Sequence, residues 1–466
     1  MASDAVLGGD GRVAAGRMLL AGWAGALVAY LAFAGWLLAN PPALSSDDAL
    51  FFAHGLVRFS ILDLSPQFPG YPGFIAIGRL LLPFAGGDPV RALALLTSLL
   101  ALALPPLAAC IALRQTGSRA VALLAFVLAL AMPLLPDLGL SLLSDGAGVA
   151  FLLVFLALLP RPGAEPSRLA TFLAGAALAW ALACRPSDAA LLAGAGLGAV
   201  AVRPAMLLPL AAGAAAVGFP VAATVLALEP LYFTEGARFT AGHALIWGNT
   251  ALSGEQTDSW LGAIAAVPGG LATAALIAAG VALALPRLRQ RSAVLAAAVA
   301  AFGAHALWIA VFQNPDSLRH LAPLLLLGGL VALLTIGGGR LRLVLPIALL
   351  AVEVAVGVTA TRLLPSPPPL QSAIGYLAGQ RAGTTVATNE GVFLLRDRLQ
   401  AIRVYDMHYP ADAALNIAMV PGAGFRLAST ALPARTPVAI FPTRFIGEHT
   451  LYLYRAACTL GSETAC

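Results

Sequence analysis

The chain contains no lysine, and all 27 of its basic residues are arginine. Only 11% of its residues are charged, whereas about 25% is usual for a soluble domain. The arginines are scattered through short loops and are not clustered with aromatic residues, so the isoelectric point near 9.3 is no sign of nucleic-acid binding. This scarcity of charge argues against an ordinary soluble protein.

Cysteine is also scarce. The 466 residues include four cysteines, and none shows the CxxC or Cys/His spacing of a metal site. Cys110 and Cys184 lie in apolar runs, where we expect small core residues. Cys458 and Cys466 lie near the C-terminus, and two interpretations of them stay open: a disulfide in an oxidising compartment, or two unpaired thiols.

Apolar residues, in contrast, are abundant. They make up 60% of the chain, and the mean hydropathy of +0.88 is typical of a polytopic membrane protein. The structural unit is then a span of ~20 residues. We expect about eleven spans, roughly at 18–39, 89–113, 119–136, 145–160, 168–184, 188–202, 205–228, 261–285, 293–312, 320–337 and 343–361. The first has an apolar core too long for a cleavable signal peptide.

The orientation of these spans depends on one ambiguous segment, "YPGFIAIGRLLLPFAGG" at 71–87. It is short, contains Arg79 and is bounded by Pro72 and Pro83, so we expect an interfacial helix. The loops RQTGSR, RPGAEPSR, PRLRQR and GGGRLR then all fall in the cytoplasm, as the positive-inside rule requires. The sequence therefore predicts a multi-pass protein of a bacterial cytoplasmic membrane, with its N-terminus inside and its C-terminus outside.

After Arg362 the chain becomes more polar, beginning with the proline-rich linker "LLPSPPPL". The segments "TTVATN", "AIRVYD", "TPVAIF" and "HTLYLYRAAC" are expected to be strands, and "LQSAIGYLAGQ" and "ADAALNIAM" helices. The predicted fold is a polytopic α-helical membrane protein with a small C-terminal α/β domain outside the cytoplasm. Residues 1–362 form the membrane domain, with a functional first outer loop at 40–88, and residues 363–466 form the α/β domain.

Five polar groups remain at the outer ends of the predicted spans. A charge within a span costs ~2.5–3.5 kcal/mol, so such residues usually have a task or a partner. By the predicted topology all five groups face the same side, which indicates a site. They are Asp47 with Asp48, Gln67 with Tyr71 in "SPQFPGYP", Asp145 with Ser144, Arg185 with Asp188 in "CRPSD", and Arg319 with His320 in "NPDSLRHLAP".

The order of these groups resembles the polyprenyl-phosphate-sugar-dependent glycosyltransferases of the C superfamily, which include protein O-mannosyltransferases and lipid A aminoarabinose transferases. In that family an acidic pair opens a pattern like D-E-x-x-Y-x-x-x-A in the first outer loop, and "DDALFFAHG" is similar to it, with Phe51 in the aromatic position and Gly55 where alanine is common. The family's Arg-Tyr-Leu-Leu-Pro motif is similar to "RHLAP", Arg319 to Pro323. The resemblance covers roughly residues 1–330.

The resemblance implies transfer of a sugar from a polyprenyl phosphate to an acceptor lipid, glycan or protein at the outer membrane face, in a single displacement. Such a reaction needs a carboxylate to accept the acceptor's proton and cations to hold the leaving phosphate. Asp47 is the candidate base, and Asp48 would orient it or bind the acceptor. Many relatives carry Lys-Pro-Pro or His-Pro-Pro before the interfacial helix, whereas "PQFPGYP" has neither Lys nor His. Phosphate binding would then depend on arginines.

Each candidate residue also has a structural interpretation that stays open at this point. Asp47 or Asp48 could cap the helix that "SSDD" opens, and Asp145 could cap its span instead of binding acceptor or sugar. Arg185 could pair with Asp188 instead of binding phosphate or sugar. Arg319 and His320 could anchor a span at the interface instead of holding the lipid phosphate.

Two other function classes are compatible with a polytopic chain that carries charges near its spans. A secondary transporter would also carry intramembrane charges, but it should show inverted repeats and broken helices near the midplane, and no repeat is evident. A non-catalytic membrane scaffold is the second alternative. Some superfamily members bind a divalent ion through acidic residues, as Asp47, Asp48 and Asp145 could. Most monosaccharide-transferring relatives use none, so we predict no metal or other cofactor.

Overall fold

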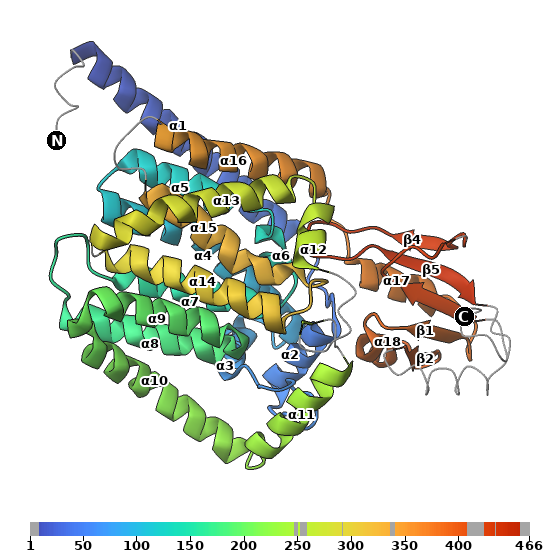
Figure 1. Cartoon of the computed structure of the whole chain (residues 1–466). Coiled ribbons are helices and arrows are strands. Elements are labelled where there is room, and N and C mark those ends of the chain that lie inside the picture. The colour runs from blue at the N-terminus through green and yellow to red at the C-terminus, as the bar shows by residue number, and fades with distance from the viewer. Residues whose placement is uncertain are drawn as a thin grey trace.

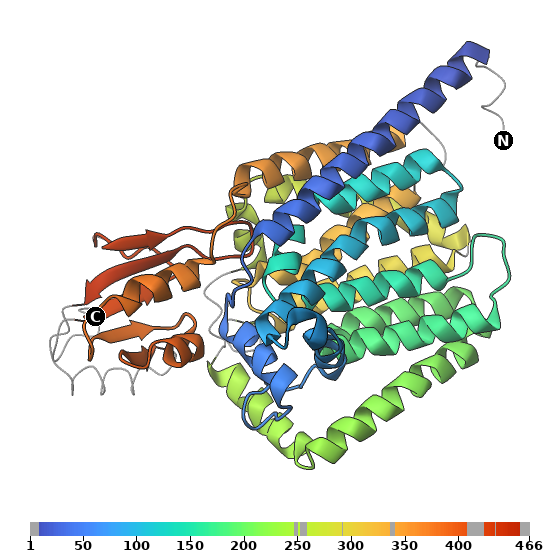
Figure 2. The same cartoon turned by 180° about the vertical axis from the view of Figure 1, so that it is seen from behind.

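The computed structural model of this chain describes residues 9–246, 250–251, 259–290, 292–335, 341–407, 424–433 and 435–456. Its helices run side by side in one bundle, and a small sheet lies at one end of that bundle (Figures 1 and 2). The first described residues of α1 (Gly9–Ala39) lie at the opposite end (Figure 1). We call the end that carries the sheet the domain end.

The bundle consists of apolar helices joined mostly by short loops. A core of buried alanine, leucine and valine joins the central helices, while leucines such as Leu20 and Leu208 remain 72% and 79% exposed. Helices that are apolar on every side are typical of membrane spans. After α1 they are α4 (Pro89–Thr116), α5 (Arg119–Ala131), α7 (Asp145–Leu158), α8 (Arg168–Cys184), α9 (Ala189–Val202), α10 (Leu207–Leu228), α13 (Gly270–Ala284), α14 (Ala293–Phe312), α15 (Ala322–Leu334) and α16 (Leu341–Ala360).

The lengths of these helices confirm a multi-pass architecture without settling the number of spans. Within the described part of the chain, 6 helices are long and apolar enough to cross a membrane. The other expected spans form apolar helices of 10–17 residues. The expected total of eleven spans therefore stays a prediction.

Serines cap the starts of three of these bundle helices. The side chains of Ser118, Ser167 and Ser292 accept the backbone N–H groups of Val121, Ala170 and Leu295, at the starts of α5, α8 and α14. A serine in this position satisfies one of the four N–H groups that lack a partner at every helix start. These caps explain why the apolar runs break at these loops.

Two segments differ from the sequence-based expectation. The span expected at 261–285 is two helices, α12 (Trp260–Ala266) and α13, because Pro268 cannot continue a helix and Gly269 turns the chain with φ +72°. The segment 229–260, which lies between two expected spans, contains α11 (Tyr232–Ile246). Both α11 and α12 lie near the domain end (Figure 1).

Three short helices also lie there: α2 (Asp47–Val57), α3 (Pro72–Leu81) and α6 (Leu135–Leu140). Helix α3 has 10 residues and continues into the 3-10 helix Leu82–Ala85, so its apolar segment is short for a bilayer span, and the expected interfacial position stays a prediction. It is attached to α2 by the Arg79 guanidinium, which donates hydrogen bonds to the carbonyls of Gly55 and Leu56. At the end of α10, the carboxylate of Glu229 accepts the backbone N–H of Ile61 in the first loop. These contacts fix the first loop to the bundle.

The C-terminal domain is a five-stranded sheet in the order β2-β1-β3-β5-β4, with helices α17 (Pro369–Ala378) and α18 (Val392–Arg398). The strands are β1 (Thr385–Thr388), β2 (Arg403–Asp406), β3 (Gly424–Ala428), β4 (Ala439–Phe441) and β5 (Leu451–Ala456). Strand β1 pairs in parallel with β2 and β3, and β5 pairs antiparallel with β3 and β4. This is a small α/β domain, as expected.

Most of the expected elements of this domain are present. The four expected strands correspond to β1, β2, β4 and β5, and "LQSAIGYLAGQ" forms α17. Strand β3 and helix α18 were not expected. The helix expected in "ADAALNIAM" and the pair Cys458 and Cys466 lie outside the described residues.

The membrane orientation can be tested with a single cysteine at Thr116, in a background whose native cysteines are replaced by alanine. We expect a membrane-impermeant maleimide to label Thr116→Cys only after permeabilisation, because the arginine-rich loops are predicted inside. Leu62→Cys, at a position 57% exposed in the first loop, should be labelled in intact cells. Labelling of Thr116→Cys in intact cells would contradict the predicted orientation.

Candidate functional site

The two adjacent carboxylates open α2, but neither of them caps it. The cap is Ser46, whose side chain accepts the backbone N–H of Ala49. Asp47 and Asp48 occupy the first turn, where the helix dipole favours negative charge. Both side chains are therefore available for contacts outside their own helix.

Asp48 faces two residues that the sequence analysis also selected. One of its oxygens accepts a hydrogen bond from Gln67 Nε2 at 3.0 Å, and the other lies 3.1 Å from Arg319 Nη2. Asp48 and Arg319 are 38% and 26% exposed, so the pair is open to solvent on one side. Arg319 stands before α15, in the short 3-10 helix Leu318–Leu321.

Arg185 is the buried centre of a second group. It follows α8, and its guanidinium lies 2.8 Å and 2.9 Å from the two carboxylate oxygens of Asp145, the first residue of α7. Its Nη1 also donates to Ser144 Oγ at 3.1 Å, and its Nε lies 3.4 Å from Asp188. Two-point pairing of this kind matches the planar shape of the guanidinium.

The charge state of Arg185 follows from these partners. Burial acts to lower the pKa of Arg185, but the carboxylates of Asp145 and Asp188 outweigh it, and the pKa is raised. The guanidinium is therefore permanently charged. The pairing with Asp188, one of the two open interpretations of Arg185, is present, and Asp145 is a second and closer partner.

Asp145 connects the two groups. Its Oδ1 lies 3.8 Å from Arg319 Nε as well as 2.8 Å from Arg185, so an alternating series of charges runs from Asp48 through Arg319, Asp145 and Arg185 to Asp188. We call these five residues the charge cluster. It joins segments from α2, α7, the end of α8 and the start of α15.

His320 and Tyr71 border the charge cluster. Nδ1 of His320 lies 3.5 Å from Arg185 Nη2, and its carbonyl lies 2.9 Å from His305 Nε2. Tyr71 precedes α3 and stacks edge-on against Phe52, with ring centroids 4.9 Å apart. Burial raises the pKa of Tyr71 to about 12, and Arg185 is close enough to oppose that shift. Its phenol therefore stays protonated and can donate a hydrogen bond into the cluster.

Several buried polar atoms of this region have no hydrogen-bond partner: Gln67 Oε1, Ser187 Oγ, Asp188 Oδ2 and Arg319 Nε. Buried polar groups are nearly always satisfied in folded proteins, so a group of exceptions requires an explanation. Gln67 Oε1 is an acceptor and Arg319 Nε a donor, which suits a ligand with both hydroxyl and anionic groups.

Asp47 lies apart from the charge cluster and faces the C-terminal domain. Its Oδ1 accepts the backbone N–H of Leu394 at 2.8 Å, in the first turn of α18. Burial raises the pKa of Asp47 to about 6, although the N–H groups of Leu394 and Phe393 oppose the shift. Among the described residues no salt bridge to Asp47 is formed. The carboxylate is therefore a stronger base than an exposed aspartate and is still ionised at pH 7.

Three charged residues near the cluster were not among the predicted site residues. Asp137, in α6, is 4% exposed, and burial raises its pKa to about 7, with Asp145 adding to the shift. Arg444 and Glu448 form a buried ion pair in the loop after β4. Gly447 of this loop approaches Asp137 so closely that a Cβ would lie 2.8 Å from its Cγ. An acidic residue in the apolar "LPDLG" segment was the available signal for Asp137.

The carboxylates considered as metal ligands face other partners. Asp48 and Asp145 lie against guanidinium groups, and Asp47 accepts backbone N–H groups. Across the described residues there is no group of three or more His, Cys, Asp or Glu side chains that could hold a metal ion. The expected lack of a metal or cofactor stays a prediction.

Comparison with known proteins finds similar structures but no similar sequence family. No protein-family model and no curated protein sequence matches the chain. The structure is similar to ArnT, an aminoarabinose transferase, from Cupriavidus metallidurans: the apo form is 12% identical, with a TM-score of 0.51, and covers 94% of this chain and 98% of that chain. For ArnT bound to undecaprenyl phosphate the identity is 13% and the TM-score 0.53, with the same coverage. The chain therefore shares the fold of ArnT.

Proposed function

We propose that this protein is a membrane glycosyltransferase that moves a sugar from a polyprenyl phosphate to an acceptor lipid, glycan or protein in a bacterial cytoplasmic membrane. The observation that carries the proposal is the position of the charge cluster next to an apolar groove, which is lined by Pro186, the residue that follows Arg185. An anionic head next to a long hydrocarbon chain is the chemistry of a polyprenyl phosphate.

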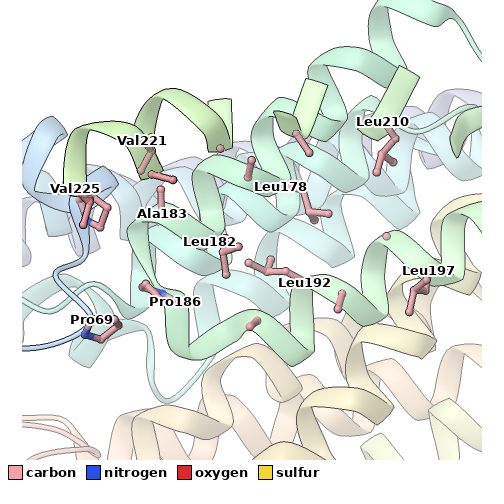
Figure 3. A pocket seen from close by; sticks show the side chains of 18 of the residues that line it. Pro69, Leu178, Leu182, Ala183, Pro186, Leu192, Leu197, Leu210, Val221 and Val225 are labelled. Atoms are coloured by element: carbon pink, nitrogen blue, oxygen red, sulfur yellow. The ribbon is translucent and has the colours of Figure 1, made fainter. Parts of the chain in front are cut away.

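The groove lies between α10 and the pair α8 and α9, and it has a volume of about 880 Å³ (Figure 3). Leu197 and Leu210 line one end of it, and Pro69, Pro186 and Val225 line the other (Figure 3). Its lining is almost entirely apolar, which suits an isoprenoid chain and offers nothing to a free sugar.

The groove and the charge cluster share short stretches of chain. Pro69 and Pro72 line the groove, and Tyr71, which borders the cluster, lies between them in the sequence. Pro186 also lines the groove and directly follows Arg185. A lipid whose chain lies in the groove would therefore place its head group near the cluster. The bound undecaprenyl phosphate of one ArnT structure supports a lipid-linked donor for this fold.

Within the cluster, the two arginines have different tasks. Arg185 is 8% exposed and is neutralised by Asp145 and Asp188, so it holds the cluster together. Arg319 is 26% exposed; it pairs with Asp48 at 3.1 Å, while its Nε lies 3.8 Å from Asp145 without a hydrogen bond, so its guanidinium is held less tightly than that of Arg185 and retains capacity for an anion. We assign the donor phosphate to Arg319, with His320 and Gln67 bordering the same space.

The proposed chemistry is a single displacement. The acceptor's O–H or N–H bond breaks as its proton moves to Asp47, and the acceptor atom forms a bond to the anomeric carbon. The bond from that carbon to the phosphate oxygen breaks, and the polyprenyl phosphate leaves with the electron pair. The raised pKa of Asp47 favours it as the base, while Asp48 is occupied by Arg319 and Gln67.

The test is transfer of a radiolabelled sugar from polyprenyl phosphates of several chain lengths in reconstituted vesicles. Donors with chains long enough to fill the groove should react, and their short-chain analogues should show a raised KM. Failure of every polyprenyl-phosphate sugar to transfer, or to compete for binding, would refute the proposed donor class.

In the same assay, Arg319→Ala is expected to lower kcat/KM for the donor by roughly 10- to 150-fold. Loss of one hydrogen bond to a charged group removes ~1.5–3 kcal/mol. Arg91→Ala is the matched control, because Arg91 is 70% exposed and pairs with Asp88 on the surface. Unchanged kcat/KM in Arg319→Ala at limiting donor would place phosphate recognition elsewhere.

A further inference from the structure

The C-terminal domain is attached to α2 at the residue that carries the proposed base. Leu394 of α18 donates its backbone N–H to Asp47 at 2.8 Å. One turn farther along α2, Phe51 packs edge-on against Phe393, with ring centroids 5.2 Å apart. Gln371 of α17 donates to the carbonyl of Leu44, just before α2, at 3.0 Å. Two elements of the domain therefore hold this short helix.

These contacts rest on a common hydrophobic core. One cluster of buried residues contains Ala49, Leu50 and Phe52 of α2 together with Leu370, Ala373, Val392 and Leu394 of the C-terminal domain. A core shared in this way resists relative movement, because interiors are close-packed and yield little. The distance between Asp47 and α18 is thus set by packing as well as by one hydrogen bond.

A second attachment joins the end of α16 to the loop after β4. Arg362, after α16, donates its backbone N–H to the carbonyl of Arg444 at 2.7 Å. The Arg444 guanidinium pairs with Glu448 and donates to the carbonyl of Ser366 at 3.3 Å. Because Gly447 of the same loop lies against Asp137 of α6, the domain contacts the bundle here as well as at α2.

The surroundings of Asp47 show what α18 contributes. The charged groups that act on Asp47 are Asp48 of its own helix and Asp406 at the end of β2, and both disfavour its ionised form. The N–H groups of Leu394 and Phe393 favour the ionised form. No cation compensates Asp47 within the described residues, so backbone groups of the domain supply the favourable contacts.

We propose that the C-terminal domain is the positioning element of the site: the backbone N–H of Leu394 orients the carboxylate of Asp47 and maintains its ionised form. The domain is then a part of the transfer machinery and not an appendage. The assignment of Leu394 rests on geometry, and only its consequence for turnover rests on the proposed function.

The test removes a single backbone hydrogen-bond donor. Leu394 is replaced by its α-hydroxy acid through nonsense suppression, which exchanges the backbone N–H for an ester oxygen and leaves the buried side chain intact. The same exchange at Leu395 is the matched control, because its N–H bonds to the carbonyl of Gly391 within α18 and does not reach Asp47. Each variant loses one backbone N–H of α18: the Leu394 ester loses the bond to Asp47, and the Leu395 ester loses the bond to the helix cap Gly391.

The first measurement needs no substrate. A carbodiimide modifies protonated carboxyl groups, so mass spectrometry of Asp47 modification against pH reports its titration. We expect a midpoint near pH 6 in the unaltered protein. It should move upward by about one pH unit in the Leu394 ester, as loss of one hydrogen bond to a charged group predicts, and stay in place in the Leu395 ester. Equal midpoints in all three proteins, or equal shifts in both esters, would overturn the proposal.

A milder variant keeps the proposal testable if the Leu394 ester folds poorly. Phe393→Ala retains both N–H groups but removes the ring contact with Phe51, so α18 is expected to loosen and the midpoint to rise by less. A midpoint that does not move in Phe393→Ala or that falls would count against the positioning role.

Turnover then separates the two proposals. If Asp47 is the base, the acid limb of the pH–rate profile should move upward in the Leu394 ester together with the modification midpoint. A shift in modification without a shift in the acid limb would retain the positioning of Asp47 by α18 and refute the assignment of Asp47 as base.

Discussion

Asp47→Asn is expected to lose at least ~100-fold in kcat, with little change in expression or in donor KM. Asparagine retains the shape of the side chain and can still accept the N–H of Leu394, but it cannot take a proton from the acceptor. General-base catalysis typically contributes 10²- to 10⁴-fold, which sets this lower bound. The measurement is single-turnover transfer from a polyprenyl-phosphate sugar by the purified variant.

Asp48→Asn is the matched comparison, because the two carboxylates are neighbours in one helical turn. Asp48 holds Arg319 and Gln67, so its loss should raise the donor KM more than it lowers kcat. Near-normal turnover in Asp47→Asn with a complete loss in Asp48→Asn would reverse the two assignments. Full activity in both variants would remove the pair from the mechanism.

The same prediction has a pH dependence of defined sign. The pKa of Asp47 is raised to about 6, so the base is protonated and inactive below this pH and ionised above it. Activity should therefore fall as the pH drops through about 6, and this limb should be absent from the residual activity of Asp47→Asn.

Arg185→Ala is expected to destabilise the protein by ~3–5 kcal/mol as well as to abolish transfer. Arg185 is 8% exposed, and its removal leaves Asp145 and Asp188, themselves 6% and 4% exposed, as buried carboxylates without their counter-ion. Breaking a buried ion pair by removing one partner costs this much because the other charge stays buried. The measurement is the free energy of unfolding in detergent, by denaturant titration.

Two variants define this prediction further. Replacing Asp145 and Asp188 by asparagine in the Arg185→Ala background should recover most of the lost stability, because no unpaired charge then remains buried. Arg238→Ala is the surface control: Arg238 is 74% exposed and pairs with Glu235, so its loss should cost under ~1 kcal/mol. Equal losses of stability in Arg185→Ala and Arg238→Ala would show that the charge cluster contributes no more than a surface pair.

Much of this protein follows from the sequence, because hydropathy and punctuation are local properties. The apolar runs predict the helices of the bundle, proline and length identify α3 as a short helix, and the change of composition after Arg362 predicts a separate α/β domain. The choice of Asp48, Asp145, Arg185, Asp188 and Arg319 also came from sequence. Ionisable residues at the ends of membrane spans are costly, so each one found there is a candidate functional residue. The structure brings these five together.

Which residue faces which partner was decided by tertiary structure alone. Arg319 and Asp48 are 271 residues apart, and Leu394 and Asp47 are 347 apart, so no local pattern relates them. The sequence could not show that Ser46 caps α2, which frees both carboxylates, or that they point to different neighbours. Nor could it place the loop of Arg444 and Gly447 against Asp137. These contacts depend on how rigid helices and a sheet pack around a shared core, and that packing brings distant segments together in ways that no local sequence property specifies.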